Sequence, residues 1–150
     1  MNKNITDIYN LIQDLSWHFG SHSFSGECCR DLSLAEFMAL KKIHECTNIS
    51  VQEIGSSLGF TKSGASKIVD RLEHKGYAVR EISTADGRVC CVNVTVKGNG
   101  TLNSIIDEYS AYVDKMLMEY DPAMLDRIKT DLEILTASAQ QHQQALIRKE

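Results

Sequence analysis

VQEIGSSLGFTKSGASKIVDRLEHKGYAVR, residues 51–80, is the stretch of sequence that decides the fold. It opens with a predicted short helix over about residues 51–58. Ser50 and Glu53 form an S-x-x-E capping box at the start of this helix, in which each residue satisfies a backbone N–H of the other. Gly59 can end the helix, because glycine adopts the left-handed conformation that side chains resist. The stretch therefore begins with a capped helix and a glycine turn.

A second helix follows the turn, and Thr61 can cap it. Its two faces differ in polarity. The apolar face carries Ala65, Ile68, Val69 and Leu72. The opposite face carries Lys62, Ser63, Ser66, Lys67 and Asp70. With the small Gly55 where the two helices cross, this spacing is typical of a helix-turn-helix, whose second helix enters the major groove of DNA.

The outward face of this second helix supplies most of the candidate DNA contacts. These are Thr61, Lys62, Ser63, Ser66, Lys67 and Arg71. Short hydroxyl donors suit phosphate oxygens close to a helix N-terminus, and lysines release counterions when they neutralise phosphates. Arg71 lies farther along the helix, so it can meet the DNA backbone or pair with Asp70 or Glu73.

The sequence period changes from helical to about two after Gly76, which predicts a β-hairpin over residues 77–96. Cys90, Val92, Val94 and Val96 are expected to share one face of its second strand, so Cys90 should be packed and Cys91 should not. The turn STADGR ends with Asp86-Gly87, a pair that tolerates positive φ, and then Arg88. Arg88 can reach a narrow minor groove.

Long amphipathic segments flank this central unit. The first predicted helix repeats apolar residues at spacings of three and four, and a capping box at Ser33 and Glu36 opens the second. Thr95 can cap a long fifth helix, and Pro122 after Asp121 opens the last. The fifth helix has an almost unbroken apolar seam: Leu102, Ile105, Ile106, Tyr109, Tyr112, Val113, Met116, Leu117 and Tyr120. The fold class is thus mainly α with a small β-hairpin.

Charge is distributed unevenly along the chain of 150 residues, whose net charge is −4. Residues 61–97 hold seven Lys or Arg and four acidic residues, a net charge of +3. The remainder of the chain holds nine Lys or Arg and sixteen acidic residues, a net charge of −7. The positive charge therefore coincides with the predicted helix-turn-helix and hairpin, as expected of a nucleic-acid surface.

The five cysteines include two adjacent pairs, an odd and clustered set that favours reduced thiols over a secreted disulfide framework. Cys28 and Cys29 lie between the first two helices, where Arg30 can favour the thiolate, so they are candidates for a redox or soft-metal sensor. A site that also uses Cys90 and Cys91, holding a metal or an iron–sulfur cluster, requires the loop and the hairpin to meet. Incidental exposed thiols are the alternative.

Catalytic and membrane classes are disfavoured. The sequence has no G-x-S-x-G, H-E-x-x-H or C-x-x-C motif and no phosphate-binding glycine loop, so we expect a protein that is not an enzyme. No apolar run approaches the roughly 20 residues that a bilayer requires, and no basic segment leads into an apolar one at the start, which predicts a cytoplasmic protein.

The sequence resembles the MarR family of regulators. The resemblance is carried by LSLAEFMAL (32–40), residues 51–80, the DGR of the hairpin and VTVKGNG (94–100). It implies a homodimer with dimerisation helices in residues 1–30 and 98–150 around a winged helix-turn-helix lobe in 31–97.

The resemblance also assigns roles to residues. It makes Thr61, Lys62, Ser63, Ser66, Lys67 and Arg71 contacts of the recognition helix. It makes Arg88 the residue of the hairpin that enters the minor groove, and it makes Asp86 a residue that supports the hairpin. It implies a regulator, usually a repressor of nearby genes, that binds a pseudo-palindromic operator and is released by a small molecule or by cysteine oxidation. The histidines of zinc-sensing relatives are not carried over, because the fifth helix has none. The alternative is a winged-helix adaptor that binds proteins and not DNA.

Overall fold

The computed structural model describes residues 2–24, 30–82 and 87–147. Its elements are α1 (Lys3–Phe24), α2 (Leu34–Glu45), α3 (Val51–Leu58), α4 (Lys62–His74), β1 (Ala78–Ile82), β2 (Val89–Val94), α5 (Val96–Leu117) and α6 (Pro122–Ile147). The predicted fold class is confirmed, since the described chain is helical apart from an antiparallel two-stranded hairpin.

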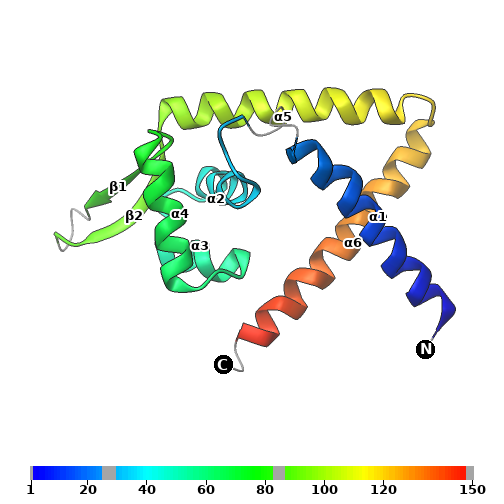
Figure 1. Cartoon of the computed structure of the whole chain (residues 1–150), viewed down its shortest axis with the longest axis horizontal. Helices are drawn as coiled ribbons and strands as arrows, with labels where there is room; N and C mark the ends of the chain where they lie inside the picture. The colour runs from blue at the N-terminus through cyan, green and yellow to red at the C-terminus, as the bar shows by residue number, and fades with distance from the viewer. Residues whose placement is uncertain (1, 25–29, 83–86, 148–150) are drawn as a thin grey trace.

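A compact lobe is formed by α2, α3, α4, the hairpin and the first half of α5 (Figure 1). Its core side chains are less than 2% exposed and come from every one of these elements: Leu40, Ile43, Ile54, Val69, Leu72, Val92, Leu102 and Ile105. Burial of so many large aliphatic side chains stabilises the lobe and fixes the orientation of α4.

Local capping defines the helices of the lobe as predicted. Both S-x-x-E boxes are formed, with Ser33 and Glu36 at α2 and Ser50 and Glu53 at α3. Gly59 ends α3 with φ +71°, the left-handed conformation expected of it. These signals are local in sequence, which is why they could be predicted from it.

The hairpin differs from the sequence prediction at two places. Its register is interrupted between Glu81 and Ile82, which pair with Cys91 and Val89, so the backbone of Cys90 is the extra residue of a β-bulge. Cys91 pairs with Glu81 in the regular part of the ladder, beside Val92, and is buried at 8% exposure although the alternation of faces predicts that it is not packed. The side chain of Cys90 lies outside the described part of the structure.

Val96 also corrects the prediction. It belongs to the first turn of α5, not to the face of the second strand, and is 93% exposed. Thr95 is the reason, because its hydroxyl accepts a hydrogen bond from the N–H of Gly98 at 3.0 Å and caps the helix there.

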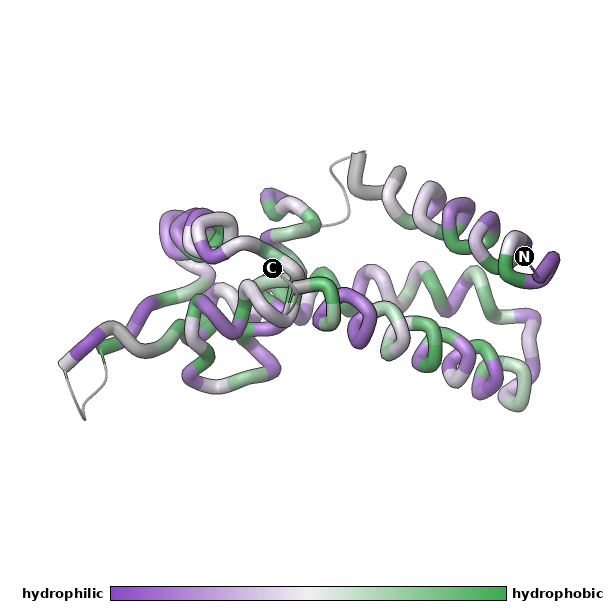
Figure 2. The backbone as a smooth tube through the Cα atoms, turned by 90° about the horizontal axis from the view of Figure 1, so that it is seen from below, coloured by the Kyte–Doolittle hydropathy of each residue, from purple (hydrophilic) through white to green (hydrophobic). Residues whose placement is uncertain are grey.

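The helices outside the lobe leave apolar side chains uncovered. Along α1 the predicted stripe is present but exposed, from 37% at Phe19 to 58% at Tyr9. Figure 2 shows apolar segments recurring along α1, α5 and α6. α6 begins at the far end of α5 and returns to contact α3 (Figure 1). Within the described part of the chain, no helix combines the length and apolar character that a bilayer-spanning helix needs.

Candidate nucleic-acid interface

The orientation of α4 is as predicted. Ala65, Val69 and Leu72 are fully buried, and Ile68 is nearly so. On the opposite side Thr61, Lys62, Ser63, Lys67 and Arg71 are exposed, whereas Ser66 is half-buried. The polar face of the helix is therefore available to a partner, although contact with DNA stays a prediction for each of these residues.

The N-terminus of α4 is built by Thr61. Its Oγ1 accepts a hydrogen bond from the N–H of Gly64 at 3.0 Å and lies 3.4 Å from Oγ of Ser63. The capping geometry leaves the N–H groups of Lys62 and Ser63, in the first turn, without intrahelical acceptors. Together with the helix dipole, these donors favour a phosphate at the end of α4 that the exposed Lys62 also flanks.

Arg80 of β1 ties the hairpin to α4, a role that the sequence analysis missed. Its backbone N–H donates to Oε1 of Glu73 at 2.8 Å, and its guanidinium donates to Oε2 of the same carboxylate. The guanidinium also forms an ion pair with Asp70 at 2.7 Å and lies 3.4 Å from the carbonyl oxygen of Ser66. The Asp70 and Glu73 carboxylates, three residues apart on one helix, were the available sequence signal.

This arrangement also bears on one of the alternatives for Arg71, while its contact with DNA stays a prediction. Asp70 and Glu73 are engaged by Arg80, so the predicted pairing of Arg71 with either of them is not what the structure describes. The charge of Arg71 instead acts on Glu36 of α2, whose pKa it helps to lower. Arg71 thus retains an exposed guanidinium at the surface of α4.

A buried carboxylate holds the C-terminal end of α4. Glu36 is 3% exposed and accepts a hydrogen bond at 2.8 Å from Lys75, the C-cap residue of α4. Burial alone raises the pKa of Glu36, but the hydrogen bonds from Lys75 and the Ser33 backbone and the charges of Lys75 and Arg71 outweigh it and hold the pKa below its usual value. The ion pair is therefore formed at neutral pH.

Tyr77 extends this anchor to the start of the hairpin. Its hydroxyl donates to Asp31 at 2.8 Å, and the ammonium of Lys97 lies 4.9 Å from the centre of its ring. Burial, followed by the hydrogen bond to Asp31 and its charge, raises the pKa of Tyr77. The C-terminal end of α4 and the root of the hairpin are thus fixed to the lobe.

The tip of the hairpin is partly described. Gly87 has φ +71° and Arg88 is exposed next to it, at the end of the hairpin that projects from the lobe (Figure 1). Asp86, the predicted brace of the hairpin, lies outside the described residues. The minor-groove role of Arg88 remains a prediction.

The structure tests the hypotheses about the cysteines only in part. Cys28 and Cys29 lie outside the described residues. Cys91 is disulfide-bonded, so the expectation of reduced thiols is wrong for this residue. Arg30, predicted to favour a thiolate, contacts Ser104 at 2.5 Å and Glu108 at 3.1 Å on α5. Across residues 2–24, 30–82 and 87–147, no three His, Cys, Asp or Glu side chains gather as metal ligands.

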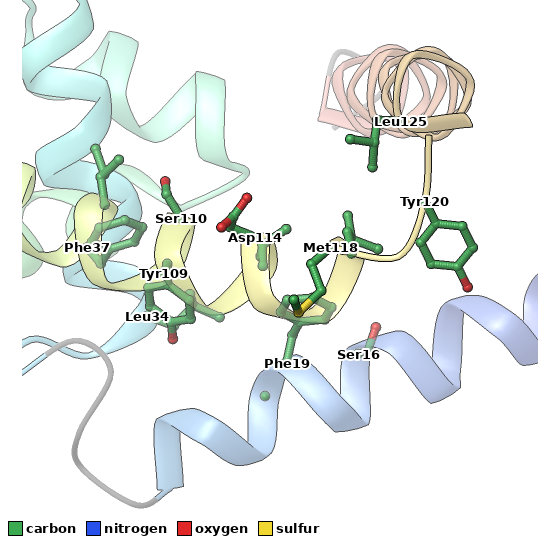
Figure 3. A pocket seen from close by; sticks show the side chains of 14 residues that line it. Ser16, Phe19, Leu34, Phe37, Tyr109, Ser110, Asp114, Met118, Tyr120 and Leu125 are labelled. Atoms are coloured by element: carbon green, nitrogen blue, oxygen red, sulfur yellow. The ribbon is translucent and has the colours of Figure 1, made fainter. Parts of the chain in front are cut away.

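A large cavity lies where α1, α2, α5 and the start of α6 approach one another (Figure 3). Its volume is about 1010 Å³, and its lining is mainly apolar and aromatic. Among the described residues on its walls, the polar side chains other than tyrosine are Ser16, Ser110 and Asp114. Cavities of this kind, apolar with few polar groups, commonly bind small molecules.

The arrangement of α3, α4 and the hairpin defines a winged helix-turn-helix protein. Residues 32–90 match the MarR family. The chain is 31% identical over 86 residues to the HTH-type transcriptional regulator MhqR of Bacillus subtilis, a match that covers 57% of this chain and 59% of that protein. The matched segment thus spans less than two thirds of the length of MhqR.

Solved structures agree on the fold. A MarR family protein from Bacillus stearothermophilus superposes with a TM-score of 0.80 at 16% identity, covering 93% of this chain and 98% of the other. FabT of Streptococcus pneumoniae, solved in complex with DNA, superposes with a TM-score of 0.72 at 19% identity, covering 93% and 97%. Residues 32–90 are thus similar to the MarR family, and the whole chain shares the fold of solved MarR structures.

Proposed function

We propose that this protein is a homodimeric, sequence-specific DNA-binding regulator that represses nearby genes from a pseudo-palindromic operator. The observation that carries the proposal is the exposed polar face of α4, whose opposite face is buried in the lobe, next to a projecting hairpin with Arg88 near its tip. A helix presented in this way fits the major groove, about 12 Å wide. The FabT structure in complex with DNA supports the same use of the fold.

A second copy of the chain accounts for the exposed apolar side chains of α1, α5 and α6. Monomeric proteins rarely leave large contiguous apolar patches in water. A two-fold dimer that covers these helices would also place two copies of α4 on successive major grooves. Sedimentation analysis should give the mass of two chains, and a single-chain mass at micromolar concentration would contradict the dimer.

DNA binding is tested with a random duplex and with genomic operator fragments at several salt concentrations. A regulator should show log affinity falling linearly with log salt and should protect a defined segment in footprinting. An adaptor that uses the winged fold for protein contacts should bind no duplex. Arg88→Ala should weaken binding while leaving the dimer intact, and unchanged affinity would remove Arg88 from the interface.

The signal that releases DNA is proposed to be a small molecule, with oxidation or a soft metal acting at the cysteines as the alternative. The cavity between α1, α2 and α5 supports the first, because a ligand there would contact both the lobe and the flanking helices. For the cysteines, an oxidant-dependent change of affinity should disappear in Cys28→Ser with Cys29→Ser. An unchanged response in that double variant would make the pair incidental.

A further inference from the structure

We propose that the cavity between α1, α2, α5 and the start of α6 is selective for hydrophobic organic cations. This inference rests on the proposed function, in which a small molecule acts at that cavity, and it specifies the chemistry of the molecule. The cavity, at about 1010 Å³, is large enough for a drug-sized ligand.

The charge of the lining has one sign. Among the described residues that line the cavity, Asp114 is the side chain that is charged at neutral pH, and none is Lys, Arg or His. Asp114 is exposed in this chain, so its carboxylate attracts a cation and repels an anion with an interaction that solvent partly screens and that a bound apolar ligand strengthens by excluding water. Anionic aromatic acids would find no charged partner on these walls.

The aromatic side chains of the lining also favour a cation. Phe37 and Tyr109 lie on one side of Asp114, Tyr120 lies on the other, and Phe19 approaches from α1 (Figure 3). Faces of aromatic rings attract cations through their quadrupole, and the attraction increases when the ion is desolvated. Ring faces and a carboxylate together match a lipophilic ion with a delocalised positive charge.

The surroundings of the cavity extend the same field. Residues 106–126 contain six acidic side chains and one basic, Lys115. Asp114 also lies in the last turns of α5, where the helix dipole is negative. Arg30, the nearby cation of the α1–α2 connection, is paired with Glu108 at 3.1 Å. The potential around the cavity therefore favours positively charged ligands.

A pair of probes with one shape and opposite charge tests the inference. Tetraphenylphosphonium and tetraphenylborate both carry four phenyl rings around a central atom, so their difference in affinity reports charge selection. Calorimetric titration of the full chain should give a Kd for the phosphonium at least about tenfold lower than that for the borate. Equal affinities, tighter borate binding or no binding of either ion would overturn the inference.

Asp114→Asn locates the selection. It keeps the size of the side chain and removes the charge, so phosphonium binding should weaken by about tenfold while borate binding stays the same or improves. Asp131→Asn, at an exposed carboxylate of α6 outside the cavity lining, should change either affinity less than about twofold. An unchanged preference in Asp114→Asn would overturn the inference, provided that its thermal unfolding matches that of the wild type.

The inference and the proposed function fail separately. Duplex binding of the ligand-free protein decides whether the chain is a DNA-binding regulator. The preference between the two ions decides the ligand class. A protein that binds duplex without preferring the phosphonium keeps the function and loses the inference.

Discussion

Replacing Arg80 should weaken both the lobe and its hold on DNA. The Arg80 side chain is 22% exposed, and Arg80→Met keeps its aliphatic part while removing the guanidinium that engages Asp70 and Glu73. The Asp70 side chain is 60% exposed, so its ion pair contributes less than about 1 kcal/mol. The bond to Glu73, which is 31% exposed, contributes about 1.5 kcal/mol, because it is charge-assisted and partly shielded.

The expected loss is therefore about 2 kcal/mol of the free energy of unfolding. Urea unfolding at a fixed protein concentration measures it, since dimer stability depends on concentration. Lys129→Met is the control: its pair with Glu133 spans 3.8 Å between side chains that are 73% and 65% exposed. That variant should lose less than about 0.5 kcal/mol. A loss below about 0.5 kcal/mol in Arg80→Met would refute the role assigned to this residue.

The same variant should bind duplex DNA several-fold more weakly at a temperature where it is fully folded. Without Arg80, the carboxylates of Asp70 and Glu73 lie uncompensated on α4, close to the proposed path of the phosphates. Fluorescence anisotropy measures this effect. Wild-type affinity in Arg80→Met would show that these carboxylates lie away from the DNA.

Two further predictions concern the supports of α4 and α5. Glu36→Gln keeps the capping box but removes the negative charge that pairs with Lys75, whose ammonium then keeps only the carbonyl oxygen of Asp31 and a neutral amide, so it should lose about 2 kcal/mol at pH 7. The pKa of Glu36 is lowered in the folded chain, so its contribution to stability is present above the unfolded pKa of about 4.3 and is lost as pH falls through the folded pKa. Urea unfolding should therefore show the free energies of unfolding of the wild type and Glu36→Gln converging at low pH. A difference that stays constant with pH would contradict this prediction. Gly98→Ala should destabilise the protein strongly, because a Cβ at this position would lie 2.0 Å from the carbonyl oxygen of Tyr77. Gly100→Ala is the control: a Cβ there would have nothing within 4 Å, so the variant should gain about 0.5–1 kcal/mol of stability. Equal effects of the two variants in thermal unfolding would refute the close approach at Gly98.

The sequence predicted the parts of the fold that short-range chemistry determines. The capping boxes of α2 and α3, the left-handed Gly59 and the two faces of α4 all depend on residues within one or two turns of one another. The candidate contacts on α4 followed from the same periodicity. Their exposure is confirmed, except that Ser66 is half-buried beside Arg80.

The errors arose where tertiary structure overrides local pattern. Cys91 is buried and disulfide-bonded although its alternation with Val92 places it on the face away from the core. The cap at Thr95 ends the strand before Val96. The Arg80 bridge was missed because its partners lie across the junction between α4 and β1, and charge counting along the chain does not show which acid a given arginine meets.

The salt dependence of duplex binding in Lys67→Ala tests the central claim most directly. Lys67 is exposed in the middle of the polar face of α4, on the side opposite the buried Ala65 and Val69. Each phosphate contact contributes about 0.9 to the slope of log affinity against log salt, so a dimer that loses two should show a slope smaller by about 2. A variant that keeps the wild-type slope would contradict the insertion of α4 into the groove.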